Sequence, residues 1–580
     1  MLKSPAYTKN EATIWPIPNY WDAIGIIIVF AIIMALAFGA KGMTSPYHFG
    51  ENISISLDPI NLPNYALRTI LRLFIALICS LIFTFTIGTL AAKNKHAEKI
   101  ILPIIDISQS IPVLSFLSIT MIGFITLFRG SMLGPECAAI FAIFTSQVWN
   151  MTFSFYQSVR TVPHDLKEVS KIFRLSRWQT FWRIEVPFAM PQLLWNMMMS
   201  MSGSWFFVTA SEAFSVANQN ITLPGIGSYI ALAIVKANTP SIFYAILTML
   251  IVIFLYDQLL FRPLTYWSEK FQANQDEDAE ISRSFIVGIF QKTKFLRVLG
   301  ETLSTIGDFF INPRLLHPKT ILTKSKPKKI KEHKNITRVY YAILISFLIA
   351  AVFFASNFIY NNFSLDEIEH VCLMGSFTAI RVLALILISS CIWVPVGVWI
   401  GTRPKVTNIA QPIVQFLAAF PTNLFFPLAA MLFLKYKLNP EIWVSPLMVM
   451  GTQWYILFNV IAGASNLPKD LKQAAATFKV RGWLKWRRLI LPGIAPYYIT
   501  GAITAAGGAW NASIIAEVIK WGNNKFEATG LGAYIAENFA NNDFANIALG
   551  TIVMCLFVLI INRLFWRPLY NIAMEKYETE

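Results

Sequence analysis

The chain has 580 residues, of which 55% are hydrophobic and only 14% are charged. Soluble proteins carry about 25% charged residues, so this composition excludes an ordinary soluble enzyme and predicts an integral membrane protein. The formal net charge is +16. The Lys and Arg residues lie in short loops between apolar runs, where they act as orientation signals for membrane insertion and do not indicate a nucleic-acid partner.

Twelve apolar runs follow one another along the chain, each close to the length of about 20 residues that a membrane-spanning helix needs. The first half contains six of them, at about 22–40, 67–92, 100–128, 137–160, 188–212 and 241–263. The second half contains the other six, at about 338–358, 372–400, 407–434, 442–463, 491–515 and 545–565. The first run begins behind a polar segment, so we expect a retained span and not a signal peptide.

Basic residues gather in alternate loops, most densely after the fourth and the tenth spans. The opposite loops are poorer in Lys and Arg, and the loop before the eighth span carries Asp366, Glu367 and Glu369. Basic loops stay on the cytoplasmic side of a membrane. With an even number of spans, this bias predicts that both termini lie in the cytoplasm.

The two halves are diverged copies of one sequence. At an offset of 305 residues, identities align without a gap from residue 135 to residue 264, and they include Trp205 with Trp510 and Glu212 with Glu517. Upstream the offset is 309, which aligns Arg72 with Arg381. Because six spans return the chain to its starting side, the copies run parallel. We expect a pseudo-two-fold axis along the membrane normal and a pathway between the halves.

The repeat divides the chain into a first six-span unit at 1–264, a polar cytoplasmic linker at 265–337 and a second six-span unit at 338–580. The linker ends in the basic run KSKPKKIKEHK, which is typical of a solvated or headgroup-facing segment. Apolar residues recur at near-helical spacing between Ile281 and Leu299. They indicate either an interfacial amphipathic helix or a small cytosolic helix packed on the transporter.

A cytoplasmic loop holds the longest cluster of identities. It reads VPHDLKEVSKIFRLSRWQTFWRIEVP at 162–187 and LPKDLKQAAATFKVRGWLKWRRLILP at 467–492. Each copy opens with Pro-x-Asp-Leu, which suits the start of a helix with an acidic residue in its first turn. Apolar residues follow at roughly helical spacing. A basic, Trp-containing second helix then leads to a proline that opens the next span.

These loops resemble the signature EAA-x3-G-x9-I-x-LP of the inner-membrane permeases of binding-protein-dependent ABC importers. Glu168, Ser170, Ile184 and Pro187 fall in register with it in the first copy, and Gln473, Ala474, Ala475, Leu489, Leu491 and Pro492 do so in the second. In that family the loop forms a coupling helix that docks in a groove on the ATPase. The resemblance therefore implies coupling roles for Asp165, Leu166, Lys167, Glu168, Phe173, Arg174, Trp178, Asp470, Leu471, Lys472, Gln473, Phe478, Lys479 and Trp483.

The chain departs from the signature at its glycine, which is Arg174 in one copy and Lys479 in the other. A long basic residue there is expected either to alter the turn or to reach acidic groups on the ATPase. Segments 67–90 and 106–119 further resemble the permeases of nitrate, sulfonate, taurine and bicarbonate importers. The fused pair of units is similar to the duplicated permeases of that anion-transport group.

The resemblance implies an all-α membrane protein of two tandem six-helix permease units in the inner membrane of a bacterial cell. It would carry a small solute, an anion, by alternating access. The chain contains no GxxxxGK[ST] phosphate-binding loop, so ATP is expected on separate cytosolic ABC ATPase subunits, as a homodimer. The chain itself is then not an enzyme and needs no cofactor. A periplasmic or lipid-anchored substrate-binding protein and membrane lipids are the other implied partners.

Eight residues in or beside the spans are candidates for the pathway: Gln109, Pro112, Trp205, Glu212, Pro421, Asn423, Trp510 and Glu517. A carboxylate near a membrane is a functional candidate. The alternative for the Trp and Glu pairs is interfacial anchoring beside a solvated carboxylate. The prolines of QSIP (109–112) and AFPTN (419–423) either free backbone carbonyls that line a cavity or simply kink their spans. Arg72 and Arg381 are expected to snorkel to the external interface, with an attractive field for an anion as the alternative.

Two rival classes are weighed against this interpretation. A secondary active transporter can also have two six-span halves, but it should carry ionisable residues inside the spans of both halves, and the sequence is poor in those. A membrane-embedded enzyme would need a convergent set such as paired Asp or His residues inside the spans, and none is evident. The six histidines are scattered and the five cysteines have no ligand spacing, so no metal site is expected.

Overall fold

The computed structural model describes residues 20–46, 54–110, 113–213, 222–269, 334–541 and 543–577, together with 302, 305, 307, 308 and 311. These residues are almost entirely helical. Contacts group the chain into two compact units. The first unit consists of residues 1–38, 162–191 and 256–323, and the second consists of residues 39–161, 192–255 and 324–580.

Each predicted apolar run of the first half is helical where it is described. The helices are α1 (Tyr20–Met43), α2 (Leu62–Phe83), α3 (Thr89–Lys93), α4 (Lys95–Ser110), α5 (Val113–Leu127), α6 (Leu133–Arg160), α7 (His164–Ile172), α8 (Arg177–Thr180), α9 (Val186–Glu212), α10 (Ile226–Val235), α11 (Thr239–Tyr256) and α12 (Arg262–Glu269). The predicted amphipathic helix between Ile281 and Leu299 lies outside the described residues, as does Pro112.

The second half repeats this order of helices and contains a β-hairpin. Its elements are α15 (Lys334–Asn362), α16 (Leu365–Gly401), α17 (Pro404–Ala419), α18 (Phe426–Tyr436), α19 (Pro440–Trp443), α20 (Ser445–Met450), α21 (Gln453–Ser465), α22 (Lys469–Thr477), α23 (Gly482–Lys485), α24 (Leu491–Ala516), β1 (Val518–Trp521), β2 (Asn524–Glu527), α25 (Leu531–Ala540), α26 (Phe544–Ile561) and α27 (Arg567–Tyr577). The strands pair antiparallel, with Val518 opposite Glu527.

Among the described residues, five helices are long and apolar enough to cross a membrane, and up to seven if each of two bent helix pairs counts as one span. This supports a predominantly helical, multi-pass membrane protein; the expectation of an all-α fold is corrected by the β1–β2 hairpin. The count of twelve spans, the pseudo-two-fold axis, the side on which the termini lie and the domain boundaries at 264 and 338 all stay predictions.

Two pairs of wide, π-helical turns lie at equivalent positions of the two halves. They are Phe181–Glu185 with Trp486–Ile490, and Asp257–Phe261 with Asn562–Trp566. Each turn is followed two residues later by a proline, at positions 187, 492, 263 and 568. Proline has no N–H group and its ring clashes with the carbonyl four residues earlier, so the helix distorts just before it. The repeated prolines therefore explain the repeated distortions.

The third span of the second half is broken at Pro421. Helices α17 and α18 meet there at an angle of 70°, and a short 3₁₀ turn, Thr422–Phe425, joins them. The last carbonyls of α17 lack partners within their own helix. The Ser202 hydroxyl of α9 donates a hydrogen bond to one of them, at Ala418. The AFPTN motif therefore both kinks the span and presents a carbonyl to the other half of the repeat.

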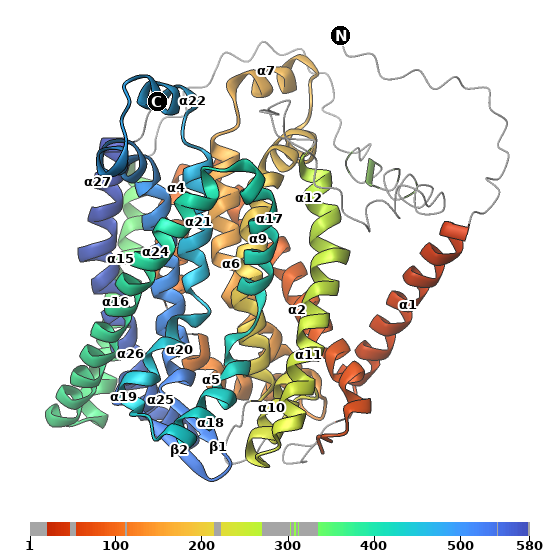
Figure 1. Cartoon of the computed structure of the whole chain (residues 1–580), viewed down its shortest axis with the longest axis vertical. Coiled ribbons are helices and arrows are strands. Elements are labelled where there is room, and N and C mark those ends of the chain that lie inside the picture. The colour runs from red at the N-terminus through yellow and green to blue at the C-terminus, as the bar shows by residue number, and fades with distance from the viewer. Residues whose placement is uncertain are drawn as a thin grey trace. The chain divides into compact units, whose positions relative to one another are not determined.

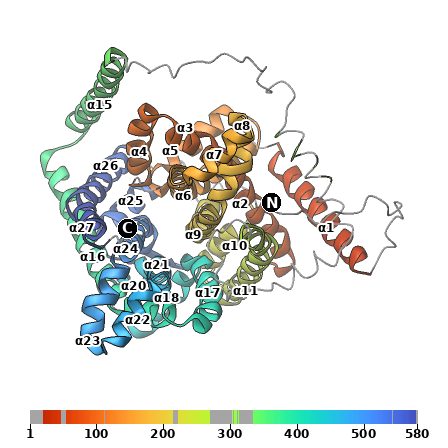
Figure 2. The same ribbon diagram turned by 90° about the horizontal axis from the view of Figure 1, so that it is seen from above.

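Within the second unit, α21 and α24 lie side by side (Figures 1 and 2) because small residues let their backbones approach. A Cβ atom added at Gly501 of α24 would lie 2.7 Å from the Tyr455 carbonyl oxygen of α21. Ala502, Ala505 and Ala509 continue this buried face of α24. In the same unit, α22 lies at one end of the helices and the β1–β2 hairpin at the other (Figure 1). The second predicted coupling helix is thus well separated from that hairpin.

Candidate functional site

The first predicted coupling loop folds into two short helices with an exposed apolar surface. Helix α7 follows Pro163 and carries Asp165 in its first turn, where a carboxylate is favoured by the helix dipole. Phe173, at its end, is 72% exposed. Leu166, Val169, Ile172 and Trp178 are also exposed. Ser176 and Gln179 form a capping box that starts α8, and the Gln179 N–H donates to the Ser176 hydroxyl at 3.2 Å.

The second loop has the same local structure. Helix α22 follows Pro468 and places Asp470 in its first turn. Phe478 is 80% exposed, and Leu471 and Trp483 are exposed too. Large apolar side chains that face solvent on a short helix indicate an interaction surface. Glu168 of the first loop contacts His164 at 3.3 Å on the surface, whereas Lys167, Lys472 and Gln473 lie on α7 and α22 as predicted.

Both loops end their first helix in a left-handed turn. The φ angle is 49° at Arg174 and 53° at Lys479, the two positions where the permease signature has glycine. The N–H groups of Arg174 and Leu175 donate to the carbonyls of Lys171 and Ser170, at 3.0 and 2.9 Å. This is the Schellman pattern that glycine usually completes. The basic residues therefore adopt the turn of a glycine and raise its conformational cost instead of changing its shape.

A buried ion cluster joins three helices of the first half. The Arg72 guanidinium of α2 donates from Nε and Nη2 to both carboxylate oxygens of Glu136 on α6, at 2.6 and 2.7 Å. Its Nη1 donates to Glu212 Oε1 at the end of α9, at 2.6 Å. All three side chains are shut off from solvent. Because the bidentate geometry matches guanidinium to carboxylate, Arg72 holds α2, α6 and α9 in register.

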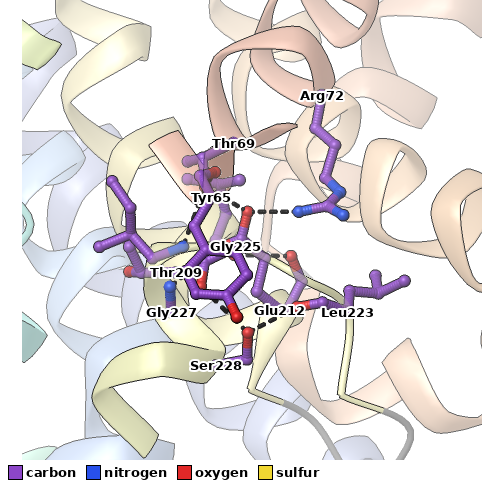
Figure 3. Close-up of polar contacts among 12 residues, drawn as sticks. Tyr65, Thr69, Arg72, Thr209, Glu212, Leu223, Gly225, Gly227 and Ser228 are labelled. Carbon is purple, nitrogen blue, oxygen red and sulfur yellow. Dashed lines mark hydrogen bonds and ion pairs between the residues drawn. The ribbon is translucent and has the colours of Figure 1, made fainter. Parts of the chain in front are cut away.

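The same cluster fixes the start of α10 (Figure 3). Thr69 Oγ1 donates to Glu212 Oε1 at 2.7 Å, and the Gly227 N–H donates to Glu212 Oε2 at 2.8 Å. The Ile226 N–H donates to Thr69 Oγ1 at 3.2 Å. A carboxylate at a helix N-terminus satisfies N–H groups that have no partner inside the helix. A Cβ at Gly225 would lie 2.2 Å from the Glu212 carboxyl carbon, so the backbone approaches too closely for a side chain there.

An equivalent cluster stands at the matching positions of the second half. Arg381 donates to Glu517 Oε1 and to Glu441 Oε2, both at 2.9 Å. Thr378 Oγ1 donates to Glu517 at 2.9 Å and accepts from the Leu531 N–H at 2.9 Å, and the Ala533 N–H completes the shell of Glu517 at 3.0 Å. Glu517 is buried, but the Glu441 side chain is 44% exposed. The two copies of the network therefore differ in the exposure of one carboxylate, which is buried at Glu136 and reaches solvent at Glu441.

These clusters correct several expectations from the sequence. Snorkelling of Arg72 is wrong, because its side chain is fully buried between two carboxylates. A solvated Glu212 or Glu517 is wrong for the same reason. Interfacial anchoring of Trp205 and Trp510 is wrong as well, since both rings are buried in the protein. The pathway roles of these four residues stay predictions.

Sequence reasoning missed Glu136 and Glu441 as members of a site. Both were visible as an identity at the repeat offset, in the matched pairs Pro135-Glu136 and Pro440-Glu441. The signal that could have found them was charge balance. Two matched arginines and two pairs of matched glutamates, all within or beside apolar runs, need one another because an unpaired charge there is costly.

Two of the remaining pathway candidates, Asn423 and Gln109, lie in polar pairs of the second unit. Asn423 shares hydrogen bonds with Thr209 Oγ1, at 2.8 and 3.2 Å, and so joins α9 to the turn after Pro421. Gln109 Nε2 donates to Asn150 Oδ1 at 3.1 Å. The structure thus brings Asn423 to the boundary between the two halves. Among the residues described, no group of three His, Cys, Asp or Glu side chains could hold a metal ion.

A small cavity opens at the same boundary between the halves. Helix α9 contributes one wall, and α17 and α21 contribute the other, with the lining residues Trp195, Met198, Met199, Ser202, Gln415, Ala418, Tyr455 and Phe458. The cavity is small, with room for about one water molecule, and it opens to solvent. None of its lining residues is charged. Residues from both copies of the repeat therefore meet around one cavity.

Comparison with known proteins identifies the repeat. Residues 84–261 and 393–567, more than half of the chain, each match the family model described as binding-protein-dependent transport system inner membrane component. The bicarbonate transport system permease protein CmpB of Synechococcus elongatus is 25% identical over 176 residues, which cover 30% of this chain and 60% of that protein. The chain thus matches less than two thirds of this relative's length.

Two further relatives are similar over shorter shares. The nitrate import permease protein NrtB of Synechocystis sp. is 27% identical over 126 residues, 22% of this chain and 43% of that protein. The glycine betaine/proline betaine transport system permease protein ProW of Escherichia coli is 27% identical over 173 residues, 29% of this chain and 44% of that protein. With the family model matched twice, this chain belongs to the binding-protein-dependent transport system inner membrane components and carries two copies of their permease region.

Proposed function

We propose that this chain forms the whole membrane pathway of an ABC importer, with one permease unit in each half and twelve spans in a bacterial inner membrane. One observation carries the proposal. Each matched permease region contains a short helix with exposed aromatic side chains and the same left-handed turn. Two equivalent docking helices in one chain suit two ATP-hydrolysing subunits, expected as a homodimer, on the cytoplasmic side with both termini.

The exposed apolar side chains of the two loops would form the contact with the ATPase. Phe173 and Phe478 protrude into solvent at the ends of α7 and α22, where burial against a partner would remove a large apolar area from water. Asp165 and Asp470 stabilise the helices that carry them, and Arg174 and Lys479 place a positive charge at each turn. Closure of the ATPases on ATP would move these loops and reorient the spans, which is alternating access.

We further propose a small anion as the cargo, delivered by a substrate-binding protein outside the membrane. The support is that relatives of this chain are named as bicarbonate and nitrate permeases. A relative of similar identity is named for betaines, so likeness at this level does not select one cargo.

A secondary active transporter is the second candidate, and one observation favours it. Both halves bury ionisable side chains, as such transporters do where they bind coupling ions. In the described residues, however, the carboxylates of Glu212 and Glu517 already accept hydrogen bonds from arginine, threonine and backbone N–H groups. A secondary transporter also needs no pair of exposed docking helices.

The test replaces the two protruding phenylalanines. The variant Phe173→Ser/Phe478→Ser and the parent chain are co-expressed with the candidate ABC ATPases of the source organism and purified in nanodiscs. Loss of an aromatic interface anchor costs about 2 kcal/mol or more, so we expect ATPase affinity to fall by about 30-fold for each loop. Leu365→Ser is the matched control, because Leu365 is equally exposed but lies at the start of α16. Unchanged ATPase association in the double variant would show that the coupling assignment is wrong.

A further inference from the structure

A backbone hydrogen bond joins the β1–β2 hairpin of the second half to α10 of the first half. The Gly522 N–H at the hairpin tip donates to the Ile234 carbonyl, near the end of α10, at 3.0 Å. The same carbonyl accepts from the Ala237 N–H at 3.1 Å. The last carbonyls of a helix have no partner within the helix itself. The hairpin of one half therefore helps to cap a helix of the other half.

The contact is made by two tight turns that lie against each other. Trp521 pairs with Asn524, so the hairpin loop has two residues, and Gly522 has a φ angle of 55°. Such a loop with glycine first is typical of a type II′ turn. Ala237 ends α10 with a φ angle of 48°. A Cβ built at Gly522 lies 3.6 Å from the Ala237 Cβ, so the two turns touch.

The remainder of the hairpin is packed on its own half. Trp521 is buried, and the Phe526 ring meets the Phe433 ring of α18 edge-on, with the centroids 5.7 Å apart. At the base of the hairpin, the Ala528 N–H donates to the Glu517 backbone carbonyl at 3.0 Å. The hairpin is thus a well-packed extension of the second half, and its tip reaches the first half.

Other contacts between the halves lie near the same end. The Thr209 and Asn423 side chains share hydrogen bonds, and Thr239 Oγ1, at the start of α11, lies 3.9 Å from the Met431 sulfur of α18. Helix α22 lies at the opposite end of the second unit (Figure 1), and the predicted orientation makes the hairpin end external. In alternating access, the two ends of a pathway open in turn. The hairpin contact must then part when its own end opens.

The sequence favours this tip in only one of the two copies. At the offset of 305, Gly522 corresponds to Ala217, which lies outside the described residues. Glycine adopts a φ angle of 55° without steric cost, whereas a residue with a Cβ atom is strained there. A tip of this kind is therefore suited to the sequence of the second half and poorly suited to that of the first.

We propose that the β1–β2 hairpin is a one-sided latch, formed by Gly522 with Ile234 and Ala237, which holds the halves together at the end opposite α22 and releases whenever that end opens. The proposal rests on the proposed role of the chain as an ABC importer. A single backbone hydrogen bond with a small contact is modest in strength. The latch therefore keeps this end shut between cycles and still yields when the ATPases close.

Hydrogen exchange on the parent chain tests release of the latch. The chain is assembled in nanodiscs with the candidate ABC ATPases of the source organism. Exchange is compared without nucleotide and with ATP plus orthovanadate, a mimic of the phosphoryl group in transfer, and retained nucleotide verifies the trapped state. Loss of one hydrogen bond corresponds to about 2- to 10-fold faster exchange, which we expect for the Gly522 amide. The Ala528 amide, whose acceptor Glu517 lies in the same half, is the matched control and should keep its protection.

A disulfide across the contact tests whether turnover requires release. In Ala237→Cys/Gly522→Cys, the Cβ separation of 3.6 Å falls in the range of about 3.5–4.5 Å that disulfides span. Oxidation should lower ATP hydrolysis by the complex on the order of tenfold, because a blocked conformational step limits turnover, and a reductant should restore it. Lys520→Cys/Lys525→Cys is the matched control, since these residues face each other within the hairpin and their disulfide should leave hydrolysis unchanged.

Peptide mass spectrometry shows which disulfides form, and the oxidised parent chain controls for its five native cysteines. Unchanged exchange at Gly522 in the trapped complex overturns the latch. So does hydrolysis at the parent rate once the disulfide across the halves has formed. The exchange result decides the matter if the cysteine substitutions disturb the turn. ATPase association is measured on the same preparations: a parent chain that binds no ATPase counts against the importer role, whereas intact association with a failed latch test rejects the latch alone.

Discussion

The two ion clusters join equivalent helices in the two halves, but their side chains differ in exposure to solvent. In the first half, Arg72 and its two glutamates are sealed from solvent. In the second half, Arg381 and Glu517 are mostly buried while Glu441 reaches the surface and accepts hydrogen bonds from the N–H and hydroxyl of Thr529, at 2.7 and 2.6 Å. Both clusters hold the end of a long helix, α9 or α24, against the start of the next short helix, α10 or α25.

One difference in sequence accompanies this contrast. Arg68 lies one helical turn before Arg72 and interacts electrostatically with Glu136, whereas the matching position of the second half is Phe377. With Arg68, the first cluster has two positive and two negative side chains. The second has one arginine for two carboxylates, and an unbalanced charge is least costly where water can reach it. The two copies thus differ in charge balance as well as in exposure.

Replacement of the cluster arginine should give the largest difference in stability loss between the two halves. Arg72→Gln leaves two carboxylates buried without their main partner, which costs about 3–5 kcal/mol. Arg381→Gln should cost less, because Glu441 can stay hydrated at the surface. Thermal unfolding of both variants in the same detergent measures the two losses. Equal losses, or a larger loss for Arg381→Gln, would contradict the link between exposure and cost.

Removal of the threonine hydroxyl that both clusters contain should lower stability equally in the two halves. The loss should be smaller than that from removal of Arg72. Thr69 and Thr378 are fully buried, and each connects a glutamate to the first N–H groups of the next helix. Replacement by the near-isosteric Val leaves the buried N–H of Ile226 or Leu531 without an acceptor, at a cost of about 1–3 kcal/mol. Hydrogen exchange of these two amides measures the effect directly.

Serine is the matched control at both positions, since Thr69→Ser and Thr378→Ser keep the hydroxyl and should retain most of the protection. If valine lowered protection in one half alone, the two clusters would not share this part of their construction. Together with the arginine variants, the threonine variants distinguish the hydrogen bonds that both clusters share from the exposure in which they differ. The contrast then rests on exposure of Glu441 and not on the hydrogen bonds around Glu517.

Sequence reasoning predicted the helices, the family and the short helices of the loops at 162–187 and 467–492, because these depend on local patterns. Their docking on an ATPase stays a prediction. Runs of apolar residues and repeated motifs are visible within a window of 20 to 30 positions, on the order of one span. The break at Pro421 was visible too, since proline acts on its own helix. The carbonyl of Ala418 and the Ser202 hydroxyl that uses it could not be paired, because they are 216 residues apart.

The ion clusters escaped prediction for the same reason. Arg72 lies 64 residues from Glu136 and 140 from Glu212, and nothing in the helical period of α2 shows which neighbour its guanidinium faces. The bland expectation of a snorkelling arginine follows from the residue alone. The burial of Arg72 depends on the packing of α2, α6 and α9 against one another, which the residue alone does not show. The duplicated sequence held the missing constraint, since matched charges in both copies indicate a conserved arrangement within the chain.

Glycine substitutions in the two left-handed turns should have the smallest effect on local stability, and they should stabilise the turn in both halves. Arg174→Gly and Lys479→Gly keep the left-handed turn and remove its steric cost, which is about 1–2 kcal/mol for a non-glycine residue. Part of this gain is offset by the greater freedom of glycine in the unfolded chain. We expect slower hydrogen exchange at the amides of Leu175 and Val480, which donate to Ser170 and Ala475 at 2.9 Å. Arg174→Lys and Lys479→Arg, which keep both charge and strain, should change nothing.

Faster exchange in the glycine variants would contradict the assignment of strain to these two residues. ATPase affinity, measured on the same proteins, separates conformation from charge. A better-ordered turn that binds the ATPase more weakly means that Arg174 or Lys479 contacts the motor through its side chain. Because the two turns have nearly the same φ angle, their stabilities should respond alike. Equal responses here, beside unequal responses at Arg72 and Arg381, would place the difference between the halves at the ion clusters and not at the left-handed turns of the predicted coupling loops.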